Sequence, residues 1–116
     1  MSLALFVRTR TRPGQRDLAR RAWEELMKPG VDGNARQPVY FFCEDNDDPN
    51  VFCLFEIYSD RATFERAAES RRFAEYMGRI GHLLAGPPEV NITTPVWIKE
   101  QGDQAMRKVE EPGGTQ

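Results

Sequence analysis

The sequence is poor in the residues that bind metals and form disulfides. It has a single histidine, His82, and two cysteines, Cys43 and Cys53, with no CxxC spacing. Because each cysteine lies in an apolar strand-like segment, we interpret both as buried, reduced thiols rather than as a metal pair or a disulfide. One histidine with two strand cysteines is a poor ligand set, so the sequence predicts no metal site.

The chain also lacks a long apolar run and a large charge of either sign. Its formal net charge of −2 argues against nucleic acid as a partner, because neutralising phosphates requires a basic surplus. No segment approaches the length of a membrane span, and the opening MSLALFV has neither the preceding charge nor the cleavage pattern of a signal peptide. With 116 residues, we expect a single cytoplasmic domain with no membrane or nucleic-acid partner.

The most informative segment is residues 51–73, VFCLFEIYSDRATFERAAESRRF. It begins as a strand of β-branched and aromatic residues over 51–58 and turns at Ser59 and Asp60. Asp60 is a helix N-cap, and apolar residues then recur every three or four positions. Ser70 offers a second N-cap, which predicts that the helix breaks there and restarts toward Leu84.

The remaining elements surround this strand–helix unit. We predict strands over 3–9, 38–44 and 90–99, a helix over 15–27 that ends at Pro29-Gly30, and a loop over 31–36. The resulting order β-α-β-β-α-β is the split βαβ, or ferredoxin-like, arrangement of an α+β fold. We assign residues 1–100 to this domain and 101–116 to a polar C-terminal tail.

The second and third predicted strands, 38–44 and 51–58, are apolar on both faces. A sheet covered by helices on one side only should alternate apolar and polar residues. The two predicted helical segments can cover one face, so the other face requires a second cover. We therefore predict a homodimer in which two sheets pack into a dimeric α+β barrel.

Four stretches carry a resemblance to a known family: LALFVRTRTRPGQ, FEIYSDRATFERA, ESRRFAEYM and LLAGPPEVNIT. Together they span residues 2–98, and they resemble the antibiotic-biosynthesis-monooxygenase-like family of dimeric α+β barrels. The resemblance implies a monooxygenase that uses no cofactor and acts on a small aromatic substrate such as a phenol, an anthrone or a quinol. Met77 stands where the haem-degrading branch of this family has a histidine, which argues against haem ligation. Ala67 stands where family members often have a histidine, so the chain lacks the imidazole usual in the quinol oxygenases.

Two other functions are compatible with the same fold. The chain can be a non-catalytic dimer that binds an aromatic or lipid-like small molecule, or a structural dimer whose interior is filled. A ligand-saturable pocket without turnover distinguishes the first from an oxygenase, and the absence of any cavity identifies the second.

Three residues are candidates for proton transfer: His82, Glu56 and Tyr58. His82 can act as a base near neutral pH, or it can be a solvent-facing residue that caps a helix end. Glu56 is the single acid in the apolar strand FCLFEIY, so it is either a catalytic base or a structural partner of Arg8. Tyr58 can present its hydroxyl to a ligand or can be a core ring with a solvated tip, as can Tyr40 and Tyr76.

Large side chains between the sheet and the helices form either a core or the wall of a substrate pocket. Asn91, beside such a pocket, can donate a hydrogen bond to a substrate oxygen. The pocket residues that we predict are Trp23, Phe42, Phe55, Phe64, Phe73, Asn91 and Trp97.

Overall fold

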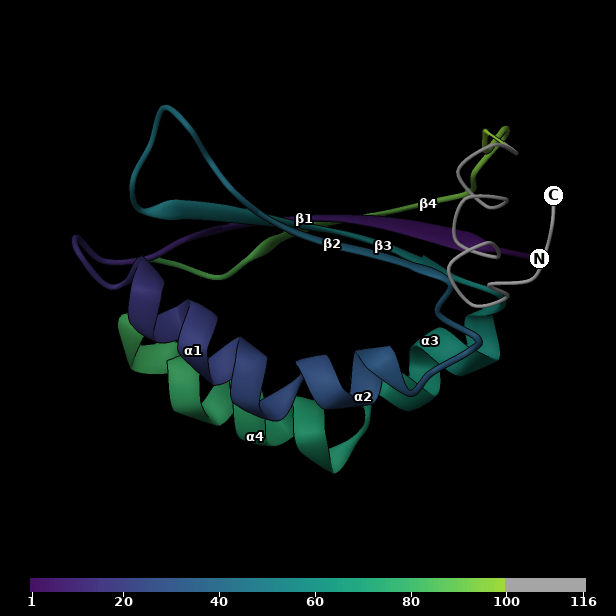
Figure 1. The fold of residues 1–116 in the computed structure, drawn as a ribbon, viewed down its shortest axis with the longest axis horizontal. Coiled ribbons are helices and arrows are strands. Elements are labelled where there is room, and N and C mark those ends of the chain that lie inside the picture. Colours follow the sequence, from purple (N-terminus) through teal and green to yellow (C-terminus); the bar gives the residue numbers. More distant parts are fainter. Residues whose placement is uncertain (100–116) are drawn as a thin grey trace, which may run out of the picture.

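A computed structural model describes residues 1–99 of the chain. These residues form one antiparallel sheet with the helices gathered on one of its faces (Figure 1), which confirms the predicted α+β class. The elements are β1 (Leu3–Arg10), α1 (Arg16–Leu26), α2 (Lys28–Asp32), β2 (Val39–Glu44), β3 (Val51–Tyr58), α3 (Arg61–Ala68), α4 (Arg71–Ile80), the 3₁₀ turn η1 (Gly81–Leu83) and β4 (Glu89–Thr93). The predicted tail lies outside the described residues.

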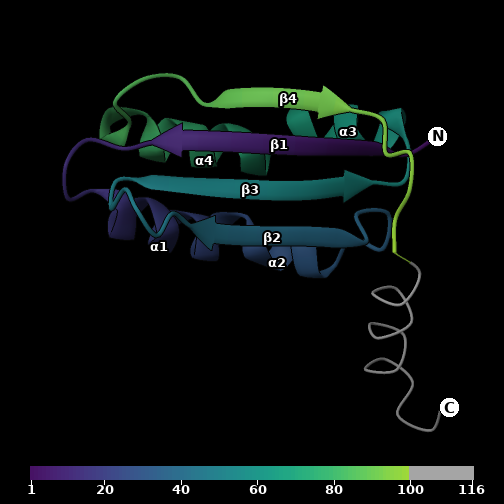
Figure 2. The same cartoon turned by 90° about the horizontal axis from the view of Figure 1, so that it is seen from above.

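The sheet has the strand order β2-β3-β1-β4, with every neighbouring pair antiparallel (Figure 2). The central strands β1 and β3 pair along their full length, from Leu3 opposite Tyr58 to Arg10 opposite Val51. This topology is the split βαβ arrangement predicted from the order of the elements.

Side-chain caps start both helices that follow β3. Asp60 Oδ1 accepts a hydrogen bond from the Thr63 backbone N–H at 2.7 Å, and Ser70 Oγ accepts one from the Phe73 backbone N–H at 3.1 Å. Each cap satisfies a donor that the first helical turn leaves unpaired. The predicted break at Ser70 is therefore confirmed, and it divides this region into α3 and α4.

Three predicted boundaries are wrong. Residues 28–32, assigned partly to a loop, form the short helix α2, because Pro29 lies in its first turn, where a missing N–H has no cost. The last strand ends at Thr93 rather than at residue 99, because only residues 89–93 pair with β1. The helix from Ser70 ends at Ile80, and a 3₁₀ turn follows it.

The main hydrophobic core lies between the sheet and helices α1 and α4. Phe52 and Ile80 are almost fully buried, and Ala19 and Ala22 are small enough to let α1 approach the sheet closely. A second cluster, made of Leu3, Leu5 and Tyr58 with Phe64 and Ala67 against it, packs under α3. Between these two clusters the helix layer spreads apart and leaves the space described below.

No helix of residues 1–99 covers the other face of the sheet (Figure 2). The register places Phe41, Phe55 and Phe6 in one row across this face, and Phe41 and Phe6 are 59% and 44% exposed. Cys43 lies opposite Cys53 on the same face and is exposed, so the prediction of a buried thiol is wrong for Cys43 in the single chain. We call this surface, made of residues 6, 41, 43, 53 and 55, the open face.

Candidate functional site

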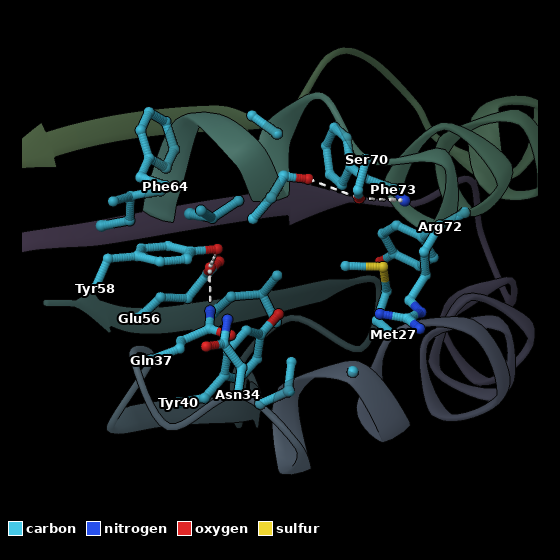
Figure 3. A pocket seen from close by; sticks show the side chains of 18 of the residues that line it. Met27, Asn34, Gln37, Tyr40, Glu56, Tyr58, Phe64, Ser70, Arg72 and Phe73 are labelled. Atoms are coloured by element: carbon cyan, nitrogen blue, oxygen red, sulfur yellow. Dashed lines mark hydrogen bonds between the residues drawn. The ribbon is translucent and has the colours of Figure 1, made fainter. Parts of the chain in front are cut away.

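A cavity of about 590 Å³ lies between the sheet and the helix layer, which is within the range of small-molecule sites. Side chains of β1, β2 and β3 form its floor, and α2, α3 and α4 form its roof (Figure 3). Most of its wall is apolar, with contributions from Leu5, Leu54, Phe64, Ala67, Phe73, Met77 and Ile80. Ser70, at the break between α3 and α4, is itself one of the lining residues.

Among residues 1–99, the only carboxyl group in the cavity wall belongs to Glu56 of β3. Its register partners are Tyr40 on β2 and Leu5 on β1, so the side chain lies on the helix-covered face. Tyr58 Oη donates a hydrogen bond to Glu56 Oε1 at 3.0 Å, and Gln37 Nε2 donates to the same oxygen at 3.2 Å. Within residues 1–99, Glu56 Oε2 accepts no hydrogen bond, so it can receive a proton or a donor from a ligand.

The predicted alternative for this residue, an ion pair with Arg8, is wrong. Arg8 stands opposite Cys53 and Glu89, which places it on the open face, whereas Glu56 lies on the helix-covered face. Residues that stand directly opposite one another on neighbouring strands have their side chains on the same face of the sheet. Because Arg8 and Glu56 lie on opposite faces, their side chains cannot form an ion pair across the sheet. No cation among residues 1–99 forms an ion pair with Glu56.

Burial raises the pKa of Glu56 above its ordinary value of 4.5, and the hydrogen bonds from Tyr58 and Gln37 oppose this effect by stabilising the charged form. Burial and the nearby Glu56 charge also raise the pKa values of Tyr58 and Tyr40 far above the ordinary value of a tyrosine. Tyr76 shows the same direction for the same reasons. The tyrosines in the wall are thus held protonated, and Glu56 is the wall group poised to exchange a proton.

Glu56 should also make the free energy of unfolding depend on pH. A carboxyl whose pKa is raised by folding contributes stability below pH 4.5 that is lost as the pH rises through its folded pKa. We expect Glu56→Gln to match the wild type near pH 4 and to become more stable than it as the pH rises. Urea unfolding from pH 4 to pH 8 measures this, with Glu65→Gln on the exposed surface of α3 as the control. Parallel curves for wild type and Glu56→Gln would contradict it.

The structure brings four of the predicted residues into the cavity wall: Glu56, Tyr58, Phe64 and Phe73. Trp23 is buried in the core outside the wall, but its indole N–H donates to the Tyr40 hydroxyl at 2.9 Å and so fixes one wall residue. Phe42 stacks on Phe52 in the same core and lies outside the wall as well.

The other four predicted residues lie elsewhere. His82 is exposed in the turn η1, and Trp97 is 77% exposed beyond β4. Phe55 packs edge-on against Phe6 with ring centroids 5.5 Å apart, on the open face. Asn91 stands opposite Phe6 in the register and shares that face. None of these four is among the residues that line the cavity.

Sequence reasoning missed several wall residues. Gln37 lies in the connection before β2 and is buried, although a glutamine beside a proline in a loop gives no signal of burial. Arg36, Arg66 and Arg72 also line the cavity, and their spacing in the sequence resembles that of any solvated helix or loop arginine. Ala67 and Met77, the two positions that the sequence resemblance singled out, both lie in the wall.

Two general features of the described chain bear on its class. Within residues 1–99, no group of three His, Cys, Asp or Glu side chains is arranged to hold a metal ion. Among the helices of the same residues, none has both the length and the apolar character needed to span a membrane.

The split βαβ topology defines a ferredoxin-like α+β domain. This domain contains a cavity of small-molecule size whose largely apolar wall includes the carboxyl of Glu56. The family model for antibiotic biosynthesis monooxygenase matches residues 2–79, so the chain belongs to the antibiotic biosynthesis monooxygenase family. The match covers β1 through most of α4 and therefore includes nearly all of the cavity wall.

Solved structures of other proteins share this fold. Rv0793 from Mycobacterium tuberculosis has a TM-score of 0.76 at 23% identity, covering 85% of this chain and 99% of its own. A protein from Caulobacter crescentus CB15 described as a "putative antibiotic biosynthesis monooxygenase" has a TM-score of 0.76 at 15% identity, covering 83% and 91%. A Nitrosomonas europaea protein with the same description has a TM-score of 0.75 at 14% identity, covering 83% and 91%. A search of curated proteins found no match.

Proposed function

We propose that this protein is a monooxygenase that binds a small hydroxylated aromatic molecule in the cavity and uses Glu56 as its base. One observation carries the proposal: among residues 1–99, a single buried carboxyl, with a raised pKa and one oxygen that accepts no hydrogen bond, lies in a largely apolar cavity of small-molecule size. Membership of the monooxygenase family supports the reaction type. The class of substrate, a phenol, anthrone or quinol, is the one that the resemblance to the family implies, and the apolar wall with its proton acceptor suits it.

The proposed chemistry requires little from the protein beyond binding and proton transfer. Glu56 removes a proton from the bound substrate, and the electron-rich anion then reduces molecular oxygen directly. For an anthrone, the methylene carbon loses two hydrogens and gains one oxygen atom, and the second oxygen atom leaves as water. A base is most effective when its pKa lies near the working pH, and burial moves the pKa of Glu56 in that direction. The apolar wall excludes water from the reactive anion.

A second candidate function is binding without turnover, as a carrier for an aromatic or lipid-like molecule. The observation that favours it is the scarcity of proton-transfer groups in the wall, where burial holds the tyrosines protonated and no histidine is among the lining residues within 1–99. A carrier needs only the apolar wall and a hydrogen-bonding group. The two functions share the cavity and differ in whether bound substrate reacts with oxygen.

Oxygen uptake by the purified protein, without added metal or flavin, tests the proposal on a panel of anthrones, naphthols and hydroquinones. We expect saturable uptake that His82→Ala leaves unchanged, because His82 is exposed in η1 and does not line the cavity. Saturable binding without uptake would support the carrier instead. The absence of both, with a folded protein, would overturn the proposal.

We further propose that the chain acts as a homodimer that buries the open face. A row of phenylalanines in which Phe41 is 59% exposed is unusual for a surface that stays in water, and extended apolar patches mark interaction sites. The cytoplasmic location, the absence of a nucleic-acid partner and independence from cofactors stay predictions from the sequence.

A further inference from the structure

The charge of the cavity wall differs in sign from the charge of the chain. The full sequence carries a formal net charge of −2, yet the residues lining the cavity include three arginines and a single carboxyl. That carboxyl, Glu56, is buried and its pKa is raised. Positive charge is therefore concentrated around an apolar space, an arrangement that attracts a negatively charged ligand.

Two of the three arginines are engaged by nearby side chains. Arg36 forms an ion pair with Asp60 at 3.3 Å, and Arg66 donates a hydrogen bond to Thr63 Oγ1 at 3.3 Å. These contacts neutralise or occupy the two guanidinium groups. Arg72 is different, because no ion pair or hydrogen bond joins its guanidinium to any of residues 1–99.

The Arg72 side chain lines the cavity, and the residue is also exposed to solvent. It leaves the first turn of α4 and reaches toward α2, beside Met27 (Figure 3). At Gly30 of α2 a Cβ atom would collide with the Arg72 guanidinium, so the two groups are in close contact. The neighbouring Arg71 behaves as an ordinary surface residue, with a side chain 94% exposed and an ion pair to Glu75 at 3.7 Å.

Arg72 and Glu56 lie at opposite ends of the cavity, with the apolar wall between them (Figure 3). A ligand that satisfies both must have a proton-donating group at one end and a negative charge at the other. A guanidinium binds a carboxylate through two parallel hydrogen bonds, and one unpaired guanidinium matches the single charge of a carboxylate.

We propose that the substrate is a hydroxyaryl carboxylate, whose hydroxyl meets Glu56 and whose carboxylate binds Arg72. This inference rests on the proposed function, because it assigns a second recognition group to the same cavity. Arg72 is a binding residue for the end of the substrate that does not react. Gly30 is a positioning residue, because a Cβ at this position would overlap the Arg72 guanidinium and force the flexible end of that side chain to shift.

Equilibrium binding of two matched probes tests the proposal: 6-hydroxy-2-naphthoate, which has the carboxylate, and 2-naphthol, which lacks it. We expect the wild type to bind the carboxylate probe about 10-fold more tightly at low salt, with the difference shrinking as salt is added. Arg72→Gln should remove this difference and leave 2-naphthol binding unchanged. Arg71→Gln is the matched control, because it deletes an adjacent arginine outside the wall, and both affinities should survive it.

A second variant, Gly30→Ala, keeps every charge but displaces the Arg72 guanidinium, so it should weaken binding of the carboxylate probe alone. Equal wild-type affinities for the two probes would overturn the inference, as would equal losses in Arg71→Gln and Arg72→Gln. An equal loss of both probes in Arg72→Gln would also overturn it, because Arg72 would then not read the carboxylate. Tight binding of 2-naphthol alone leaves the proposed function intact, whereas failure of both probes to bind contradicts the proposed function itself.

Discussion

Glu56→Gln should lower the turnover number for oxygenation by about 10²–10⁴-fold, the usual contribution of a general base. Glutamine has nearly the same shape and keeps an oxygen that can accept from Tyr58 and Gln37, so the wall and the substrate affinity should change little. Steady-state oxygen uptake measures both quantities, and we expect kcat to fall while KM stays within a few-fold. An unchanged kcat would remove Glu56 from the reaction, and a large rise in KM alone would make it a binding residue.

Tyr58→Phe tests whether the protonation of Glu56 controls the rate of oxygenation. The hydroxyl of Tyr58 stabilises the charged carboxylate, so its removal should raise the pKa of Glu56 further. The acid side of the pH–rate profile should therefore move to higher pH, with the maximal rate largely retained. A merely structural role for Tyr58 would change stability without moving the profile. His82→Ala is the control for loss of a titratable side chain outside the wall.

Phe41→Asp should dissociate the proposed homodimer. Phe41 lies on the edge strand β2, in register with Phe55, and is the most exposed phenylalanine of the open face, so a charge there would be buried without a partner when two copies associate. An unpaired buried charge costs several kcal/mol, so we expect the dimer affinity to fall by at least about 10²-fold. Sedimentation velocity at micromolar concentration measures the change from dimer to monomer.

Leu18→Asp is the matched control for this experiment. Leu18 is an exposed apolar residue, 47% accessible, on α1 and therefore on the opposite side of the molecule from the open face. The variant should sediment like the wild type. A wild-type monomer, or a dimer that Leu18→Asp dissociates and Phe41→Asp does not, would contradict the assignment of the open face as the interface.

The order and type of the elements could be predicted because their signals are local. The caps at Asp60 and Ser70, the alternation in β1 and the apolar period of α4 each lie within a few residues. The errors have local causes as well. A proline after a helix can mark the end of that helix or the first turn of a new one. Pro29 lies in the first turn of the new helix α2.

The site could be predicted only in part, because it depends on which face of each strand the helices cover. Alternation along β3 separates Glu56 from Phe55, but it does not say which of the two faces meets the helices. This ambiguity explains why the sequence predicts Phe55 and Asn91 in the pocket and offers Arg8 as a partner of Glu56, which the structure does not bear out. The contact between Gln37 and Glu56 and the path of Arg72 over Gly30 join distant parts of the chain, and no local pattern indicates them.

The most direct test of the central claim is a two-dimensional amide NMR titration of the protein with 2-naphthol. We claim that a small aromatic molecule binds between the sheet and the helices, with its hydroxyl at Glu56. The saturable shift changes should therefore centre on Gln37, Glu56, Tyr58, Ala67 and Met77. Saturable changes confined to the open face, around Phe6 and Phe41, or no saturable change at all, would contradict the claim.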